Sequence, residues 1–163
     1  MDNNNLNVTE TAGNETGVTL YDALKLDNQI CFPMYACSRE IIKQYKAYLD
    51  KLDLTYTQYI AMMVLWECKT VTAKELGKRL YLDSGTLTPL LKRLEGKGFL
   101  NRRRDPSDER SLLVNITEEG EALREQAINV PCRMAEHSVL TDEEAETLYR
   151  ILYKMLTAEE RQA

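Results

Sequence analysis

The sequence predicts a mainly α fold with a small β-wing, in which longer helices lie toward both ends of the chain. Two patterns support this prediction. Leu87, Leu90, Leu91 and Leu94 have the spacing of one helical face, which is typical of a helix packed against a core. Residues 99–116 contain two short runs of strand-forming residues around a polar loop, which is typical of a β-hairpin.

Length and composition fit one soluble domain, because 163 residues with 44% hydrophobic and 29% charged side chains can bury a core. No apolar run approaches the roughly 18 residues of a membrane-spanning helix, so we expect no membrane association. Residues 1–20 are rich in Asn, Thr, Gly and Glu and predict a disordered tail before a domain at 21–163. No secretory signal is apparent, so we expect a cytoplasmic protein.

Charge is distributed unevenly along the chain. The formal net charge is −5, yet residues 69–110 carry 11 Lys or Arg against 6 Asp or Glu, a local balance of +5. The remaining residues therefore sum to −10. A basic DNA-binding lobe on an acidic scaffold would have this pattern, although a solvated charged face would also produce it.

Several helices can be placed from local signals. Residues 26–52 have helical periodicity, and Pro33 indicates that Cys31 lies close to a helix start or a kink, because proline is best tolerated in a first turn. A Ser or Thr followed three residues later by Glu or Gln forms a capping box at a helix N-terminus. Three such pairs predict helices at 57–67, 73–80 and 142–158, namely Thr55 with Gln58, Thr72 with Glu75, and Thr141 with Glu144.

A helix-turn-helix is predicted in the middle of the chain. Residues 81–83 form a short link between the helix at 73–80 and the helix with the leucine stripe, which Gly96 and Gly98 end. The face opposite the leucines carries small, hydroxyl and basic side chains, as expected of a helix in the major groove. These residues are Gly85, Pro89, Lys92 and Arg93, with Thr86 and Thr88 on the flanks of the face.

A β-wing follows the second helix of this motif. Strands are predicted at residues 100–103 and 112–116. Thr117 should cap one further helix at 118–138, which Pro131 should bend. The fold class is therefore a winged helix-turn-helix.

The remaining helices predict an oligomer. Residues 55–117 would form the DNA-binding lobe, whereas 21–54 and 118–163 would supply N- and C-terminal dimerisation helices with apolar stripes that the small body cannot cover. A two-fold homodimer would suit a palindromic site on double-stranded DNA.

The four cysteines, Cys31, Cys37, Cys68 and Cys132, are widely separated and contain no C-x-x-C pair. A zinc site would need improbable ligands, so we expect no metal and no cofactor. Cys37 and Cys68 lie in regular helical stretches, and we expect both to be packing residues. Composition alone leaves open whether Cys31 is a small core residue or a reactive thiol.

Three segments together resemble the MarR family of regulators and, within it, the organic hydroperoxide resistance regulator (OhrR) branch. They are LDNQICFPMY at 26–35, YLDSGTLTPLLKRLE at 81–95 and DPSDERS at 105–111. The third segment is typical of the broad family, and the first two narrow the resemblance to the branch. The resemblance extends over residues 26–156.

This resemblance implies a redox-sensing site. Cys31 would be the peroxide-reactive thiol, and Tyr45 and Tyr56 would donate hydrogen bonds to it, some across the dimer. The chemistry agrees, because a thiolate attacks peroxide and the leaving oxygen needs a proton. Some members of the branch also resolve the oxidised thiol with a late cysteine of the other subunit. Cys132 fits that role a few residues from the expected place, and a small cellular thiol is the alternative.

The resemblance also implies a set of DNA contacts. The helix hydroxyls would contact bases and phosphates, two basic residues would neutralise phosphates, and the wing tip would enter the minor groove. A carboxylate would brace the wing arginine by a charge-assisted bond. The helix hydroxyls are those of Ser84, Thr86 and Thr88, and the two basic residues are Lys92 and Arg93. The wing-tip residue is Arg110, and the carboxylate beside it is that of Asp108.

We therefore expect a DNA-binding repressor that senses organic hydroperoxides and releases DNA on oxidation, and not an enzyme. Two alternatives stay open. A thiol peroxidase would also use Cys31 but would leave the basic wing without a purpose. A regulator released by a phenolic or drug-like ligand would instead use an aromatic dimer pocket, which could be lined by Tyr35, Tyr45, Tyr48, Tyr56 and Tyr59.

Overall fold

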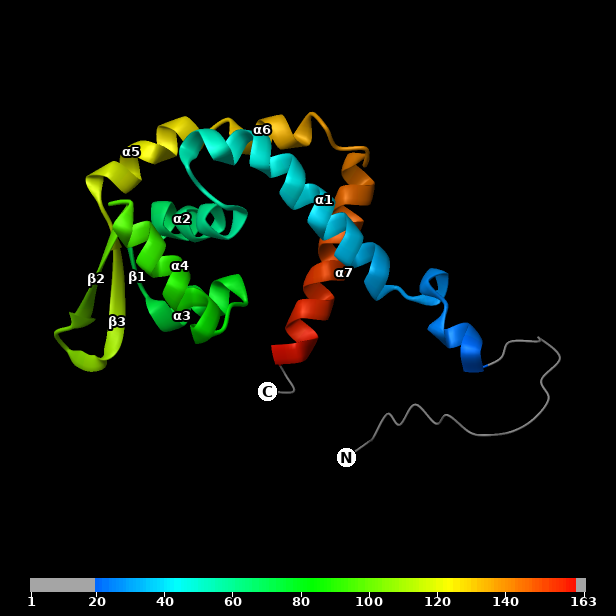
Figure 1. Cartoon of the computed structure of the whole chain (residues 1–163), viewed down its shortest axis with the longest axis horizontal. Coiled ribbons are helices and arrows are strands. Elements are labelled where there is room, and N and C mark those ends of the chain that lie inside the picture. Colours follow the sequence, from blue (N-terminus) through cyan, green and yellow to red (C-terminus); the bar gives the residue numbers. More distant parts are fainter. Residues whose placement is uncertain (1–19, 161–163) are drawn as a thin grey trace. The chain divides into compact units, whose positions relative to one another are not determined.

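The structure is a computed structural model that describes residues 20–160 (Figure 1). The predicted disordered tail lies, apart from its last residue, outside the described residues. The chain divides into two compact units between Ile41 and Ile42, and each is described by itself. None of the described helices is long and apolar enough to cross a membrane.

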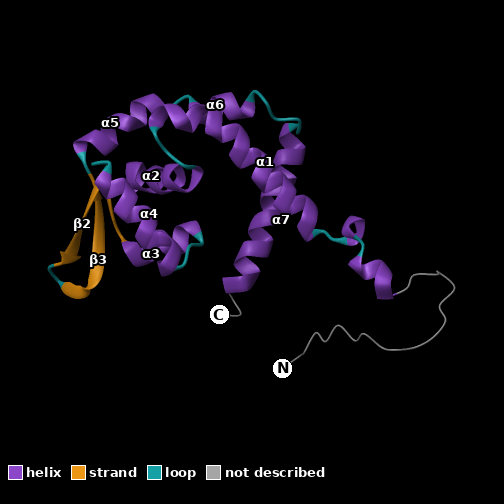
Figure 2. Cartoon of the chain, viewed as in Figure 1, coloured by secondary structure: helices purple, strands orange, loops and turns teal. Residues whose placement is uncertain are grey.

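Helices dominate both units, and the strands form one small sheet (Figure 2). The helices are α1 (Cys31–Leu49), α2 (Tyr56–Cys68), α3 (Ala73–Leu80), α4 (Ser84–Gly96), α5 (Glu118–Ala127), α6 (Val130–Ala135) and α7 (Asp142–Glu160). The strands are β1 (Thr70–Thr72), β2 (Leu100–Asp105) and β3 (Asp108–Ile116), and the short 3₁₀ helices are η1 (Leu20–Leu24), η2 (Leu26–Asn28) and η3 (Asp50–Leu52).

The first unit contains η1, η2 and the beginning of α1. The predicted helix at 26–52 is too long at both ends, since η2 and η3 occupy its first and last turns. The Asn28 side chain donates to the backbone oxygen of Asp22 at 2.7 Å, which folds the chain back before α1. Cys31 is the first residue of α1 and Pro33 the third, so the predicted position of Cys31 at a helix start is confirmed.

The second unit contains a core built from α2, α3, α4 and the sheet. Leucines from three helices fill it, and Leu65, Leu76 and Leu94 are fully buried. Leu49, at the end of α1, is 1% exposed and joins the same core. The Trp66 indole N–H donates to the Gly120 carbonyl at 2.8 Å, which attaches α5 to α2.

The helix-turn-helix has the predicted limits. Thr72 accepts from the Glu75 N–H at 3.1 Å at the start of α3, although the reciprocal half of this capping box is replaced by an ion pair between Glu75 and Arg79. Tyr81 ends α3 in the left-handed conformation, with φ of 53°. Asp83 then caps α4 by accepting from the Thr86 N–H at 2.9 Å. The other two predicted capping boxes have both of their hydrogen bonds.

The sheet is antiparallel, with strand order β1-β3-β2. Val114 of β3 pairs with Val71 on one side and Arg102 on the other. β1 was not predicted from the sequence, and both wing strands are longer than predicted. β1 has only three residues and is held by its pairing with β3, so no local pattern marks it.

The single bent helix predicted at 118–138 is wrong. α5 ends at Ala127 and α6 begins at Val130. Pro131 lies in the first turn of α6, where its missing N–H costs no helical hydrogen bond. After α6, α7 exposes most of its predicted apolar stripe in the single chain, including Leu148 and Ile151.

Candidate DNA interface and reactive thiol

The outer face of α4 is free of contacts with the core. Leu87, Leu91 and Leu94 are at most 5% exposed on the inner face, and all of the predicted contact residues of this helix are exposed. Hydrogen bonds from the Thr86 backbone and side chain hold the pKa of Asp83 below its ordinary value. The cap therefore stays ionised at neutral pH and fixes the N-terminal end of the helix.

Two of the three predicted hydroxyls already have a partner within the helix. The Thr86 hydroxyl donates to Asp83 at 2.9 Å, and the Thr88 hydroxyl donates to the Ser84 carbonyl at 2.7 Å. Each threonine keeps a lone pair to accept from a base amino group and a methyl group for contact with thymine. These bonds hold the threonine rotamers before DNA arrives.

Ion pairing separates the 11 basic residues of 69–110 into two groups. Four have acidic partners among the described residues, and these are Lys69, Arg79, Lys97 and Arg102. The other seven have no ion pair within residues 20–160, and these are Lys74, Lys78, Lys92, Arg93, Arg103, Arg104 and Arg110. All seven are exposed, so their charge is available to phosphates.

The wing turn is organised by two aspartates. Asp105 accepts from the backbone and hydroxyl of Ser107 at 2.9 and 2.7 Å, and these bonds lower its pKa. Asp108 accepts from the Arg110 backbone N–H at 3.1 Å and from the Ser111 hydroxyl at 2.8 Å. The expected contact between Asp108 and Arg110 therefore runs through the backbone, and the Arg110 guanidinium is left exposed at the wing.

Two exposed basic residues on the wing and one ion pair at its base were not predicted from the sequence. Arg103 and Arg104 are exposed, on adjacent positions of β2. The run of three arginines at 102–104 could have signalled them. Arg102 instead turns to Glu95 of α4, and no local pattern distinguishes it from its neighbours.

Tyr45 and Tyr56, predicted as a pair, do lie together. Their ring centroids are 4.9 Å apart, and the Tyr59 ring lies 6.0 Å from that of Tyr45. Burial raises the pKa of Tyr45, with a further contribution from Tyr56, and raises the pKa of Tyr59 to about 12. The Tyr45 and Tyr59 phenols therefore remain protonated donors throughout the physiological pH range.

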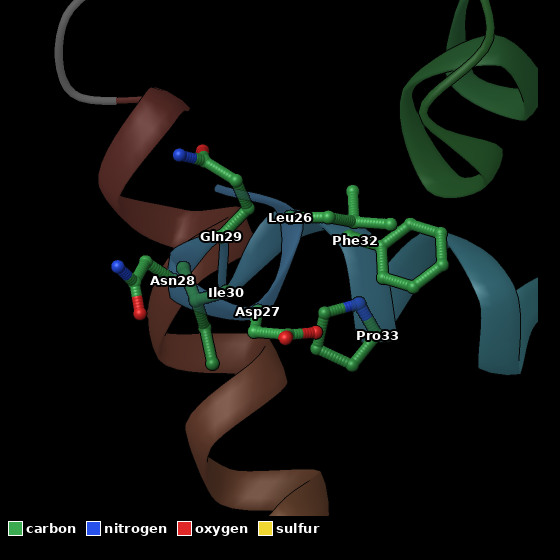
Figure 3. Close-up of a pocket in the computed structure, with 7 residues that line it drawn as sticks. All are labelled: Leu26, Asp27, Asn28, Gln29, Ile30, Phe32 and Pro33. Carbon is green, nitrogen blue, oxygen red and sulfur yellow. The ribbon is translucent and has the colours of Figure 1, made fainter. Parts of the chain in front are cut away.

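Cys31 is exposed at the start of α1. A cavity of about 420 Å³ lies beside it, lined by seven residues of the stretch 26–33 (Figure 3). Both sequence neighbours of Cys31, Ile30 and Phe32, line this cavity. Its walls are mostly apolar at Leu26, Ile30, Phe32 and Pro33 and polar at Asp27, Asn28 and Gln29.

The other cysteines only partly follow the prediction. Cys37 is exposed, so its assignment as a packing residue is wrong for the single chain. Cys68 is half-buried, and its sulfur accepts from Arg79 at 3.2 Å. Cys132 is exposed on α6.

Similarity to known proteins identifies the family. The model of the transcriptional regulator SarA/Rot family matches residues 43–126. The organic hydroperoxide resistance transcriptional regulator of Bacillus subtilis (strain 168) is 49% identical over 136 residues, which cover 83% of this chain and 92% of that protein. The chain belongs to the organic hydroperoxide resistance branch of the MarR family. As a MarR-family member it is a homodimeric, DNA-binding transcriptional regulator rather than an enzyme.

Two further relatives support the MarR-family assignment. The regulator SarZ of Staphylococcus aureus (strain USA300) is 42% identical over 120 residues, which cover 74% of this chain and 81% of SarZ. Reduced AbfR bound to DNA is 33% identical, with a TM-score of 0.70 over 85% of this chain and 96% of that one. AbfR comes from Staphylococcus epidermidis and has also been solved in an overoxidised form on DNA and in a disulfide form.

Proposed function

We propose that this regulator is a cytoplasmic repressor that binds a palindromic operator when reduced and releases it after an organic hydroperoxide oxidises Cys31. The position of Cys31 carries the proposal. Its thiol is exposed at the first residue of a helix, and its neighbours line a largely apolar cavity. Apolar walls suit the alkyl or aryl group of an organic hydroperoxide.

The proposed oxidation transfers one oxygen atom. The Cys31 thiolate attacks the outer peroxide oxygen, the O–O bond breaks, and the products are a sulfenic acid and an alkoxide. The alkoxide then takes a proton from a donor and leaves as an alcohol. The peroxide is thus reduced by two electrons, and the sulfur is oxidised by two.

We assign the proton donors to Tyr45 and Tyr56, with some of these contacts made across the dimer, as the resemblance to the family implies. The elevated pKa of Tyr45 and its packing on Tyr56 keep a protonated phenol available for that role.

Cys132 of the partner is the proposed resolving thiol. Attack of its thiol on the sulfenic sulfur would form an intersubunit disulfide and release water. Its exposure on the short helix α6 supports this assignment, and the bond would need the two Cα atoms within about 7 Å. A mixed disulfide with a small cellular thiol is the alternative outcome.

DNA recognition is assigned to α4 and the wing. Ser84, Thr86 and Thr88 would contact the major groove, and Lys92 and Arg93 would bind phosphates. Arg110 would enter the minor groove while Asp108 holds its backbone. All seven residues are exposed, and the three basic ones form no ion pair with any residue in the described part of the chain, which supports the assignment.

The test uses a labelled duplex that the wild-type protein selects from a random-sequence pool. Cumene hydroperoxide should release this duplex from wild-type protein, as followed by fluorescence anisotropy. Cys31→Ser should bind the duplex with nearly unchanged affinity but fail to release it. Cys37→Ser is the matched control, because it removes another exposed thiol of α1 and should respond like wild type.

Release of the Cys31→Ser variant by the hydroperoxide would overturn the sensor assignment. Release by salicylate, without any thiol modification, would favour regulation by a phenolic ligand. Mass spectrometry of the oxidised wild type, run with and without reductant, should find Cys31 joined to Cys132. A small-thiol adduct on Cys31 instead would exclude Cys132 as the resolving residue.

A further inference from the structure

One ion pair joins the recognition helix directly to the wing. Glu95 lies in the last turn of α4, and Arg102 is the third residue of β2. One carboxylate oxygen of Glu95 accepts from the Arg102 backbone N–H at 3.0 Å. The other oxygen accepts from Nε of the same arginine at 3.0 Å and from its Nη2.

The environment makes this pair stronger than an ordinary surface pair. The Arg102 side chain is 18% exposed and that of Glu95 is 35% exposed, so solvent screens them incompletely. Hydrogen bonds from the Arg102 side chain, and then from its backbone, hold the pKa of Glu95 below its ordinary value. Charge-assisted bonds of this kind also restrict the geometry of the groups they join.

The backbone contact gives the outer edge of β2 a hydrogen-bond partner on α4. β2 is an edge strand, because β3 is the one strand that pairs with it among residues 20–160. Edge strands carry N–H groups without a partner strand, and Glu95 accepts from one of them. The carboxylate therefore holds the β2 backbone, and not only a side chain, against the end of α4.

Small rotations at this point would move the wing tip a long way. Arg102 pairs with Val114, and Arg110 lies four residues from Val114 along β3. Four strand residues extend about 13 Å, so a rotation of about 15° at the base would displace Arg110 by about 3.5 Å. That displacement exceeds the distance range over which a hydrogen bond persists.

We propose that the pair of Glu95 and Arg102 is a positioning device, which sets the angle between the recognition helix and the wing so that both grooves are engaged together. The proposal rests on the DNA-binding function and goes beyond it, because neither residue needs to contact DNA. Glu95 is an acid beside a DNA-binding surface, and its removal would strengthen binding if bulk charge alone mattered. A loss of DNA affinity when Glu95 is replaced is therefore the opposite of what bulk charge predicts, and it would indicate a positioning role.

The test measures affinity for the selected duplex across a range of salt concentrations. Glu95→Gln should bind about 5 to 20 times more weakly than wild type. Glu121→Gln is the matched control: it makes the same charge change at a side chain of similar exposure, 38% against 35%, which lies on α5 and pairs with Lys69 and Arg124. This control should bind as tightly as wild type or slightly more tightly.

A double-mutant comparison with Arg110→Ala distinguishes a positioning role of Glu95 from a general loss of structure. Arg110→Ala should weaken binding at least fivefold in the wild-type background but less than twofold when combined with Glu95→Gln. Hydroxyl-radical footprints of Glu95→Gln should lose protection in the minor groove. Protection of guanine N7 in the major groove, where α4 binds, should remain.

Equal affinities of Glu95→Gln and Glu121→Gln would overturn the proposal, as would an equal cost of Arg110→Ala in both backgrounds. Trp66 fluorescence checks that each variant is folded. If Glu95→Gln does not fold, Arg102→Lys replaces it in the same affinity measurements. This variant keeps the positive charge but removes the contact of Nε and Nη2 with the Glu95 carboxylate. Failure of the wild-type protein to select any duplex would overturn the DNA-binding function and this inference with it.

Discussion

The substitution Gly120→Ala tests how closely α5 must pack against the residues at the base of the wing. The Gly120 carbonyl accepts from the Trp66 indole, and its N–H donates to Thr117 at 3.0 Å. A Cβ atom at this position would overlap the carbonyl oxygen of Phe99 and would lie 2.9 Å from the Ile116 side chain. The substitution Gly120→Ala therefore forces α5 away from the strands.

The expected cost follows from these contacts. Overpacking of a well-packed site costs about 1–3 kcal/mol, and loss of good geometry in the buried Trp66 hydrogen bond adds about 1 kcal/mol. We expect Gly120→Ala to lower the free energy of unfolding by about 2–4 kcal/mol. With an m-value of about 2 kcal/mol per molar urea, the unfolding midpoint should fall by about 1–2 M.

Urea unfolding followed by Trp66 fluorescence measures this change, because Trp66 is the single tryptophan and is 8% exposed. Protein concentration must be held constant, since unfolding of a dimer depends on it. Gly96→Ala is the control: no atom lies within 4 Å of its added Cβ, so the midpoint should stay or rise slightly. Equal urea midpoints for wild type and Gly120→Ala would show that the close approach of α5 at Gly120 does not limit stability.

Three further predictions concern the interface and the sensor. Lys92→Ala should lower the slope of log affinity against log salt concentration by about one phosphate contact per subunit. Arg110→Ala should weaken DNA binding at moderate salt. Unchanged binding by both variants would show that neither residue contacts DNA. Tyr45→Phe and Tyr56→Phe should leave DNA affinity intact but slow Cys31 oxidation, measured by loss of free thiol; an unchanged rate would reject them as donors. Folding lowers the pKa of Glu95, so the stabilisation by its charged form is complete above the ordinary pKa of 4.5 and is lost as the pH falls through the lower pKa of the folded protein. Glu95→Gln should therefore reduce the loss of unfolding free energy over that pH range. The same pH dependence of stability in wild type and variant would contradict the lowered pKa.

Local signals in the sequence predicted much of the fold correctly. The cap at Thr72 gave the limits of α3, and the leucine stripe with its glycines gave α4. Pro33 correctly placed Cys31 at the start of a helix. Each of these signals acts through contacts between residues three or four apart, so no knowledge of the rest of the chain is needed to interpret them.

The candidate site was only partly predictable in this way. The sequence supplied the basic residues of 69–110, but the ion pairs decide which of them are free for phosphate. It also paired Tyr45 with Tyr56 through a family resemblance, and the short distance between their rings became known only from the fold. The assignment of Cys31 as the sensor stays a prediction that the oxidation experiment tests.

The sequence alone was sufficient to place α2, α3, α4 and α7 to within about two residues, to identify the buried face of α4 and to locate the wing. Only the tertiary structure decided the presence of β1, the break between α5 and α6, and the contact of Glu95 with Arg102. The physical reason is the range of the interactions. Thr70 pairs with Asn115 across 45 residues of sequence, and the choice of Arg102 among three adjacent arginines depends on where β2 packs against the end of α4.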